Sequence, residues 1–144
     1  MSRPVSPRRR VADWPERLAG LVEGRMLSPF AWGLQDCVTL AADAVAALTD
    51  VDPLASLRGT YATEAEAEAI IARDGNLYRL VCRLWAEAGL PQCPPALAQR
   101  GDTAWVQGEN DQAMGVVLGA VVAVPGADRL RFHPASAILR AWVT

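Results

Sequence analysis

The residues best placed to do chemistry in this sequence are Asp36 and Cys37, which follow the turn-prone pair Trp32 and Gly33. Apolar residues recur at helical spacing from Cys37 to Leu48, which predicts an amphipathic helix with Asp36 as its N-cap. A thiol in the first helical turn lies near unpaired N–H groups and the positive end of the helix dipole, and both favour the thiolate. This pattern is typical of a nucleophilic cysteine.

A purely structural role for Cys37 fits the same pattern. Free cysteines are commonly buried, and Cys37 shares its helical register with Leu40 and Ala41. The carboxylate of Asp36 also disfavours a thiolate beside it, because like charges repel. The helix pattern alone therefore leaves both a core cysteine and a nucleophile open.

The neighbourhood of Cys37 resembles a known family. Residues 30–37, which read FAWGLQDC, resemble the nucleophile segment of the NlpC-type cysteine peptidases of bacterial cell walls, and more closely that of their phage and prophage relatives. Two later stretches match in family order, a glycine–aspartate turn at 101–102 and a strand at 113–119 that is similar to the family's H-V-G-I-Y-x-G. The resemblance implies a papain-like fold with Cys37 as the nucleophile. It also implies groove and turn positions at Trp32, Gly33, Gly101 and Asp102.

The sequence departs from the family at the catalytic base. When the glycines are aligned, the catalytic histidine falls on Ala113, with Gln112 as its polar neighbour, and neither can act as a base. The family's third catalytic group would lie near residues 122–125, which are apolar. The chain has one histidine, His133, and it would have to approach the thiol from a neighbouring strand.

Two functions follow from this resemblance. The missing base favours a phage or prophage tail-tip protein with a structural or assembly role, on a peptidase-like fold whose catalysis is degraded. Its partners would be other tail proteins and, as a further ligand, peptidoglycan; its location would be the virion tail. The alternative is an active peptidoglycan endopeptidase or amidase that uses Cys37 as nucleophile and His133 as base.

Composition limits the other classes of function. The chain has 144 residues, enough for one domain with a sizeable core, and its formal charge of −2 gives no basic field for nucleic acid. Its three cysteines, Cys37, Cys82 and Cys93, have neither metal-ligand spacing nor the even number of a disulfide framework. We therefore predict no cofactor, no metal and synthesis in a reducing compartment.

Residues 1–12 contain four arginines, two prolines and two serines, and we expect a flexible Arg-rich arm ahead of a single domain at 13–144. The run of Arg8, Arg9 and Arg10 either docks on an acidic neighbour or stays solvated. No apolar segment typical of a signal peptide follows it, so we expect synthesis in the bacterial cytoplasm without such a peptide. The apolar run at 114–124 is far shorter than the roughly 20 residues that span a bilayer.

Periodicity predicts helices first and strands later. Caps and apolar stripes indicate helices at about 13–24, 36–48, 63–73 and 76–88, with Asp13 and Glu16 as a capping pair for the first. Short β-branched runs indicate strands at about 103–107, 115–118, 120–124, 130–133 and 137–143. This order predicts an α+β domain in which N-terminal helices pack on a small C-terminal antiparallel sheet.

Overall fold

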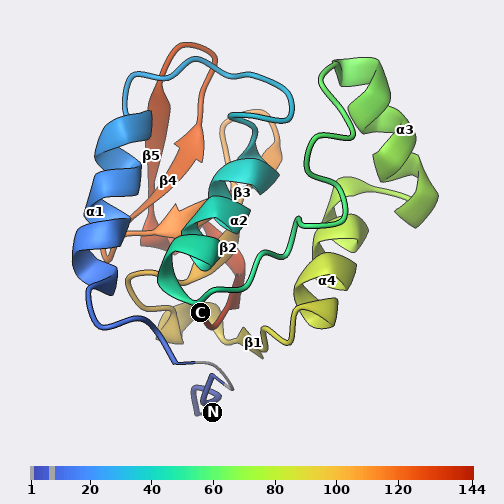
Figure 1. Ribbon diagram of the computed structural model, residues 1–144. Coiled ribbons are helices and arrows are strands. Elements are labelled where there is room, and N and C mark those ends of the chain that lie inside the picture. The colour runs from blue at the N-terminus through green and yellow to red at the C-terminus, as the bar shows by residue number, and fades with distance from the viewer. Residues whose placement is uncertain (1, 7–8) are drawn as a thin grey trace.

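The structure is a computed structural model that describes residues 2–6 and 9–144, and in it four helices precede a six-stranded antiparallel sheet (Figure 1). This confirms the predicted α+β class. The helices are α1 (Trp14–Arg25), α2 (Cys37–Leu48), α3 (Glu64–Asp74) and α4 (Leu77–Glu87). The strands are β1 (Gln92–Cys93), β2 (Thr103–Gln107), β3 (Gln112–Val117), β4 (Val121–Pro125), β5 (Leu130–Pro134) and β6 (Ile138–Trp142), in the order β1-β6-β2-β3-β4-β5.

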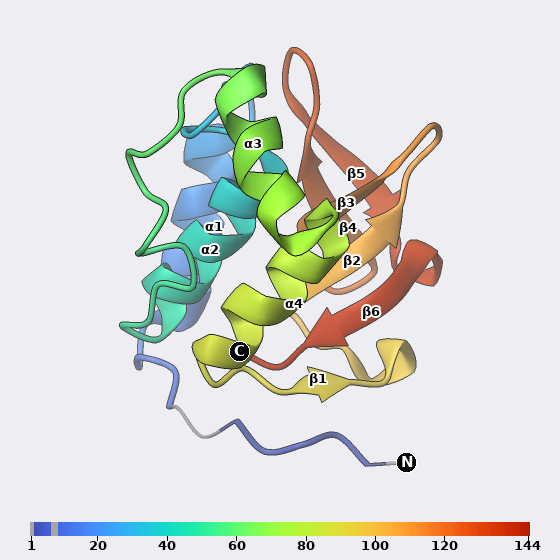
Figure 2. The same ribbon diagram turned by 90° about the vertical axis from the view of Figure 1, so that its right-hand side faces the viewer.

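Helix α2 lies at the centre of the molecule, between α1 and the sheet, while α3 and α4 stand beside it (Figures 1 and 2). Side chains alternate along β3, so Met114 and Val116 face the helices. Ala113 and Val117 face the other way, toward a second apolar cluster on the far side of the sheet. The two faces of β3 therefore have different surroundings.

The sheet separates between β3 and β4. Strand β2 pairs with β3 along its length, whereas β4 pairs with it only at Val116 and Val117. If the register continued, Pro125 would lie opposite Met114, and proline has no N–H to donate. Next to the last paired residues, a Cβ on Gly115 would lie 2.7 Å from the carbonyl oxygen of Ala123. The close approach of β4 to β3 therefore requires glycine at this position.

Three of the four predicted helix caps are present, since Asp36, Thr63 and Asn76 each accept the backbone N–H three residues ahead. The predicted cap at Asp13 is wrong. Its side chain makes no capping hydrogen bond, and one carboxylate oxygen instead accepts from Arg17 Nε at 3.0 Å. The backbone of Asp13 is not extended, with φ −94° and ψ 27°, and so it does not aim the carboxylate at the first turn.

The segment ahead of α1 lies against the body of the domain. Asp102, whose side chain is 0% exposed, accepts from Arg3 Nη1 at 2.5 Å and from Arg10 Nη2 at 3.3 Å. It also accepts the backbone N–H groups of Gln99 and Thr144, so this buried carboxylate is neutralised and fully hydrogen-bonded. Arg10 of the predicted arginine run thus binds its own domain, whereas Arg8 lies outside the described residues.

The limits of some strands differ from those predicted. β3 begins at Gln112, three residues earlier than expected, and β1 at Gln92–Cys93 was not predicted. The first residues of β3 pair with β2 across the hairpin between them, whereas β1 relies on pairing with β6, which is far away in the sequence. Within the described residues, no helix has both the length and the apolar content needed to cross a membrane.

Candidate functional site

Helix α2 begins at Cys37 because Asp36 caps it in a reciprocal arrangement. The Asp36 carboxylate accepts the Thr39 N–H at 2.8 Å, and the Thr39 hydroxyl oxygen accepts the Asp36 N–H at 2.8 Å. Both residues are buried. The position of the thiol at the start of the helix is therefore fixed by local sequence, as predicted.

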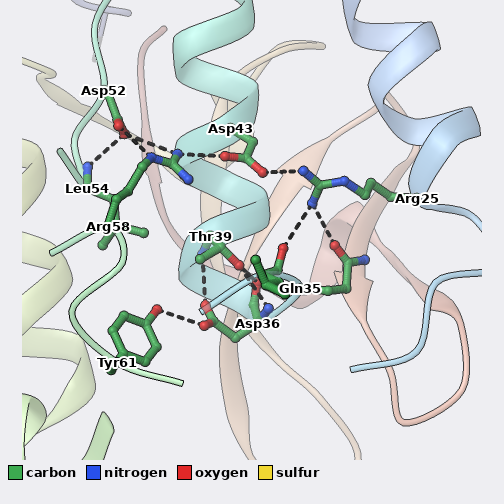
Figure 3. Close-up of polar contacts among 10 residues, drawn as sticks. Arg25, Gln35, Asp36, Thr39, Asp43, Asp52, Leu54, Arg58 and Tyr61 are labelled. Atoms are coloured by element: carbon green, nitrogen blue, oxygen red, sulfur yellow. Dashed lines mark hydrogen bonds and ion pairs between the residues drawn. The ribbon is translucent and has the colours of Figure 1, made fainter. Parts of the chain in front are cut away.

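The Asp36 carboxylate also joins two loops (Figure 3). It accepts the backbone N–H of Gly33 at 2.8 Å and the hydroxyl of Tyr61 at 2.7 Å. Gly33 has φ +79°, and a Cβ there would collide with the carbonyl oxygen of Tyr61. Burial and the hydrogen bond to Asp36 raise the pKa of Tyr61, so its hydroxyl stays a donor.

Two arginines and two aspartates form a chain of ion pairs beside the start of α2 (Figure 3). Arg25 donates to Asp43 at 2.5 Å and to the side-chain oxygen of Gln35 at 2.7 Å. Arg58 donates to the second oxygen of Asp43 at 2.6 Å and to Asp52 at 2.5 Å. These contacts tie α1, α2 and the loop after α2 into one unit around the cysteine.

The thiol of Cys37 is not activated. Burial raises its pKa to about 12, and the negative charges of Asp36 and Asp111 act in the same direction. Hydrogen bonds from the backbone at Met114 and Val38 oppose this rise without cancelling it. At neutral pH Cys37 is therefore an un-ionised thiol, despite its place at the positive end of a helix dipole.

His133 lines the same cleft as Cys37, but no described hydrogen bond joins the two residues. His133 sits on β5 opposite Val122, whose side chain belongs to the cluster on the far face of the sheet. A Cβ on Gly108, in the β2–β3 hairpin, would lie 3.8 Å from His133 Cε1. The imidazole therefore lies close to the hairpin.

The position aligned with the family's histidine also faces away from the thiol. Ala113 packs on the far-side cluster, whereas Cys37 packs on the cluster that contains Met114. Gln112 is on the helix-facing side, where its Oε1 accepts from Trp105 Nε1 at 2.8 Å and its Nε2 donates to Gln107 at 3.1 Å. Sequence spacing alone did not reveal this, because alternation divides the residues of a strand between two faces without showing which face meets the helices.

A cleft of about 1270 Å³ opens beside Cys37. One wall is made by α3, α4 and the loop after α2, and the other by the β2–β3 and β4–β5 hairpins. Trp32 lines it, as predicted for the groove, and packs edge to face with Phe30 at 4.8 Å between ring centroids. Gly101 and Asp102 do not line it; they contact Arg10 in the N-terminal segment.

The described residues contain no group of three or more histidine, cysteine or acidic side chains that could hold a metal ion. All three cysteines are free, with Cys82 partly buried and Cys93 buried. What the cleft offers a ligand is apolar surface, aromatic rings, peptide groups and side chains of both charges.

Comparison with known proteins places the chain in a family. A family model described as a domain of unknown function (DUF6950) covers residues 9–144. No curated protein and no solved structure matches the chain.

Proposed function

We propose that this chain, which belongs to the DUF6950 family, is a phage or prophage tail-tip protein that has a structural or assembly role. It uses a peptidase-like arrangement of helix and sheet as a binding scaffold and carries out no hydrolysis. The observation that carries the absence of hydrolysis is the surroundings of Cys37, where burial and the charges of Asp36 and Asp111 keep the thiol protonated and no described base hydrogen-bonds to the sulfur. A thiol of that kind is not a nucleophile at neutral pH.

Cysteine hydrolases require a base within hydrogen-bond distance of the sulfur, about 2.6–3.2 Å for the heavy atoms. Among the described residues, the groups that hydrogen-bond to the Cys37 sulfur are backbone groups, and the charged groups that affect it are Asp36 and Asp111. Two carboxylates hold the proton on the sulfur rather than remove it. The site therefore lacks the arrangement that would generate a thiolate.

Other features of the site support a binding role. The cleft beside Cys37 is large, and its loops are held by the contacts of Asp36 and Asp43. Rigid loops around a preformed cleft lose little conformational entropy when a ligand binds. Tail proteins and peptidoglycan are the ligands implied by the resemblance at residues 30–37.

Digestion of purified peptidoglycan tests the absence of hydrolysis. Wild-type protein and the variant Cys37→Ala should both release soluble fragments at the rate of buffer alone. A wild-type activity that disappears in Cys37→Ala would overturn the proposal. It would support the alternative, an active peptidoglycan endopeptidase or amidase.

The same assay tests that alternative further, since His133 lines the cleft that Cys37 adjoins. If His133 were the base, His133→Ala should lower the activity as much as Cys37→Ala does, because the two groups would act as a unit. Activity that survives His133→Ala would require another base.

The assembly role has its own test. Particles from the bacterial strain that encodes the chain should contain it in their purified tails, detected by mass spectrometry and by antibody labelling at the tip. Its absence from tails of otherwise complete particles would contradict the assembly role and leave the result on hydrolysis untouched.

A further inference from the structure

The first half of β3 presents backbone groups that none of the other described strands pairs. The N–H of Val117 donates to Asp102 O, and the N–H of Gly101 donates to Val117 O, so Val117 points its peptide groups at β2. Because peptide groups alternate along a strand, Gln112 and Met114 point theirs at β4. β4 does not pair there, because its ladder with β3 ends at Val116.

This open edge faces the cleft. Gln112 lines one side of the opening, while Pro125 and Gly126 line the other. The N–H of Met114 approaches the sulfur of Cys37. The N–H of Gln112 and the carbonyl groups of Gln112 and Met114 have no strand opposite them in the described part of the chain. An unpaired stretch of strand is a template for an added strand.

An apolar chamber adjoins the edge. Leu57, Ile71, Leu77 and Leu80 line it from the loop after α2 and from α3 and α4. Leu57, Ile71 and Leu77 are only partly buried, so their side chains contact both the core and the cleft. A chamber of this composition suits one large aliphatic or aromatic side chain.

Side chains of both charges line the cleft. The acidic Glu64 lies on α3, in one wall, while the acidic Glu109 and Asp111 on the β2–β3 hairpin and the basic Arg129 on the β4–β5 hairpin lie in the other. None of these four side chains forms an ion pair with any described residue, in contrast to Arg131, which pairs with Asp128 at 2.6 Å. Their charges are therefore available to a ligand that carries both signs.

From these four observations we infer that the cleft binds an extended polypeptide segment of a partner protein. The segment adds to β3 at Gln112, places a large apolar side chain in the chamber, and flanks it with one basic and one acidic residue. This inference rests on the proposed binding function and gives the chemistry of the partner.

A displayed library of random linear 12-residue peptides, selected on the purified full chain, tests it. Enriched sequences should share a large apolar residue flanked by a basic and an acidic one, and their synthetic peptides should be measured by calorimetry. The decisive variants are Gln112→Pro, which removes the N–H that faces the cleft, and the matched control Gln112→Ala, which removes only the side chain. Gln112 is the first residue of β3, where proline is tolerated.

The peptides should bind Gln112→Pro about ten-fold more weakly than they bind Gln112→Ala, the effect of one lost hydrogen bond, because both variants lack the glutamine side chain and only proline lacks the N–H. N-methylation of the peptide group that pairs with Gln112 should give the same loss on wild-type protein, which keeps the test valid if Gln112→Pro fails to fold. No enrichment over a bare surface, or equal binding to both variants and to N-methylated peptides, would overturn the inference. Either result leaves the absence of hydrolysis standing, since only the digestion assay decides that.

Discussion

The sulfur of Cys37 accepts a hydrogen bond from the backbone of Met114 at the point where β3 and β4 separate. If the pairing continued, Pro125 would lie opposite Met114. Proline has no N–H to donate, so the two residues could not form the usual pair of backbone hydrogen bonds. The thiol therefore lies beside a backbone group of β3 that β4 does not pair. This contact gives Cys37 a structural reason to be present without any catalysis.

Cys37 should react slowly with alkylating agents. With a pKa of about 12, roughly one thiol in ten thousand is ionised at pH 8. Iodoacetamide labelling followed by peptide mass spectrometry should show Cys37 labelled far more slowly in native protein than in urea. Selective labelling of Cys37 over Cys82 and Cys93 at neutral pH would contradict the inert state.

Alkaline conditions should destabilise the fold through the same thiol. The pKa of Cys37 rises from 9.0 to about 12 on folding, so above pH 9 the unfolded chain releases a proton that the folded chain keeps. Stability is therefore full below about pH 9 and falls as pH rises toward 12, by about 1.4 kcal/mol at pH 10.

Urea unfolding of the wild type and of Cys37→Ala at pH 8 and pH 10 measures this effect. The variant should lose less stability between the two values, although Tyr61, whose pKa is also raised, contributes to the loss in both proteins. Equal losses in the two proteins would show that the thiol is not responsible.

Gly33→Ala should be much more destabilising than Gly59→Ala. Both glycines have positive φ, +79° and +75°, so alanine costs each about 1 kcal/mol of backbone strain. A Cβ at 33 also meets the carbonyl oxygen of Tyr61, whereas a Cβ at 59 meets nothing within 4 Å. We expect an additional loss of about 2 kcal/mol for Gly33→Ala in thermal or urea unfolding. Equal losses would mean that the loop moves aside.

Asp102→Ala should cost about 3 kcal/mol of stability, because it leaves Arg3, Arg10 and two backbone N–H groups without their acceptor. Asp128→Ala is the matched control. It breaks an ion pair of similar geometry with Arg131, but its side chain is 70% exposed, so the change should stay within about 0.5 kcal/mol. Urea unfolding of both variants checks this, and a small effect at Asp102 would show that the N-terminal contacts contribute little.

Features that depend on neighbours in sequence were predictable. The cap at Asp36 and the apolar stripe of α2 lie within 12 residues of each other, and the predicted helix agrees with the observed one. The state of its thiol was not predictable, because it depends on burial and on Met114 and Asp111, which approach Cys37 only in the folded domain.

The role of Asp102 illustrates the same limit. Its glycine–aspartate pair predicts a turn, and the turn is present. The two arginines that neutralise its carboxylate are 99 and 92 residues away in the chain, and no local pattern indicates such a pairing. Long-range ion pairs are invisible to periodicity, which reports only the face that a residue occupies.

Residues near both ends of the chain contact Asp102, and this affects how the molecule can be attached to a partner or a surface. Figure 1 shows the first described residues and the C-terminus in the lower part of the view and the β2–β3 and β4–β5 hairpins, which line the cleft, in the upper part. A fusion partner, surface anchor or affinity tag joined at either end would therefore extend from the same side of the molecule. Such an attachment would leave the opposite side, where the cleft opens beside α2, exposed to solution.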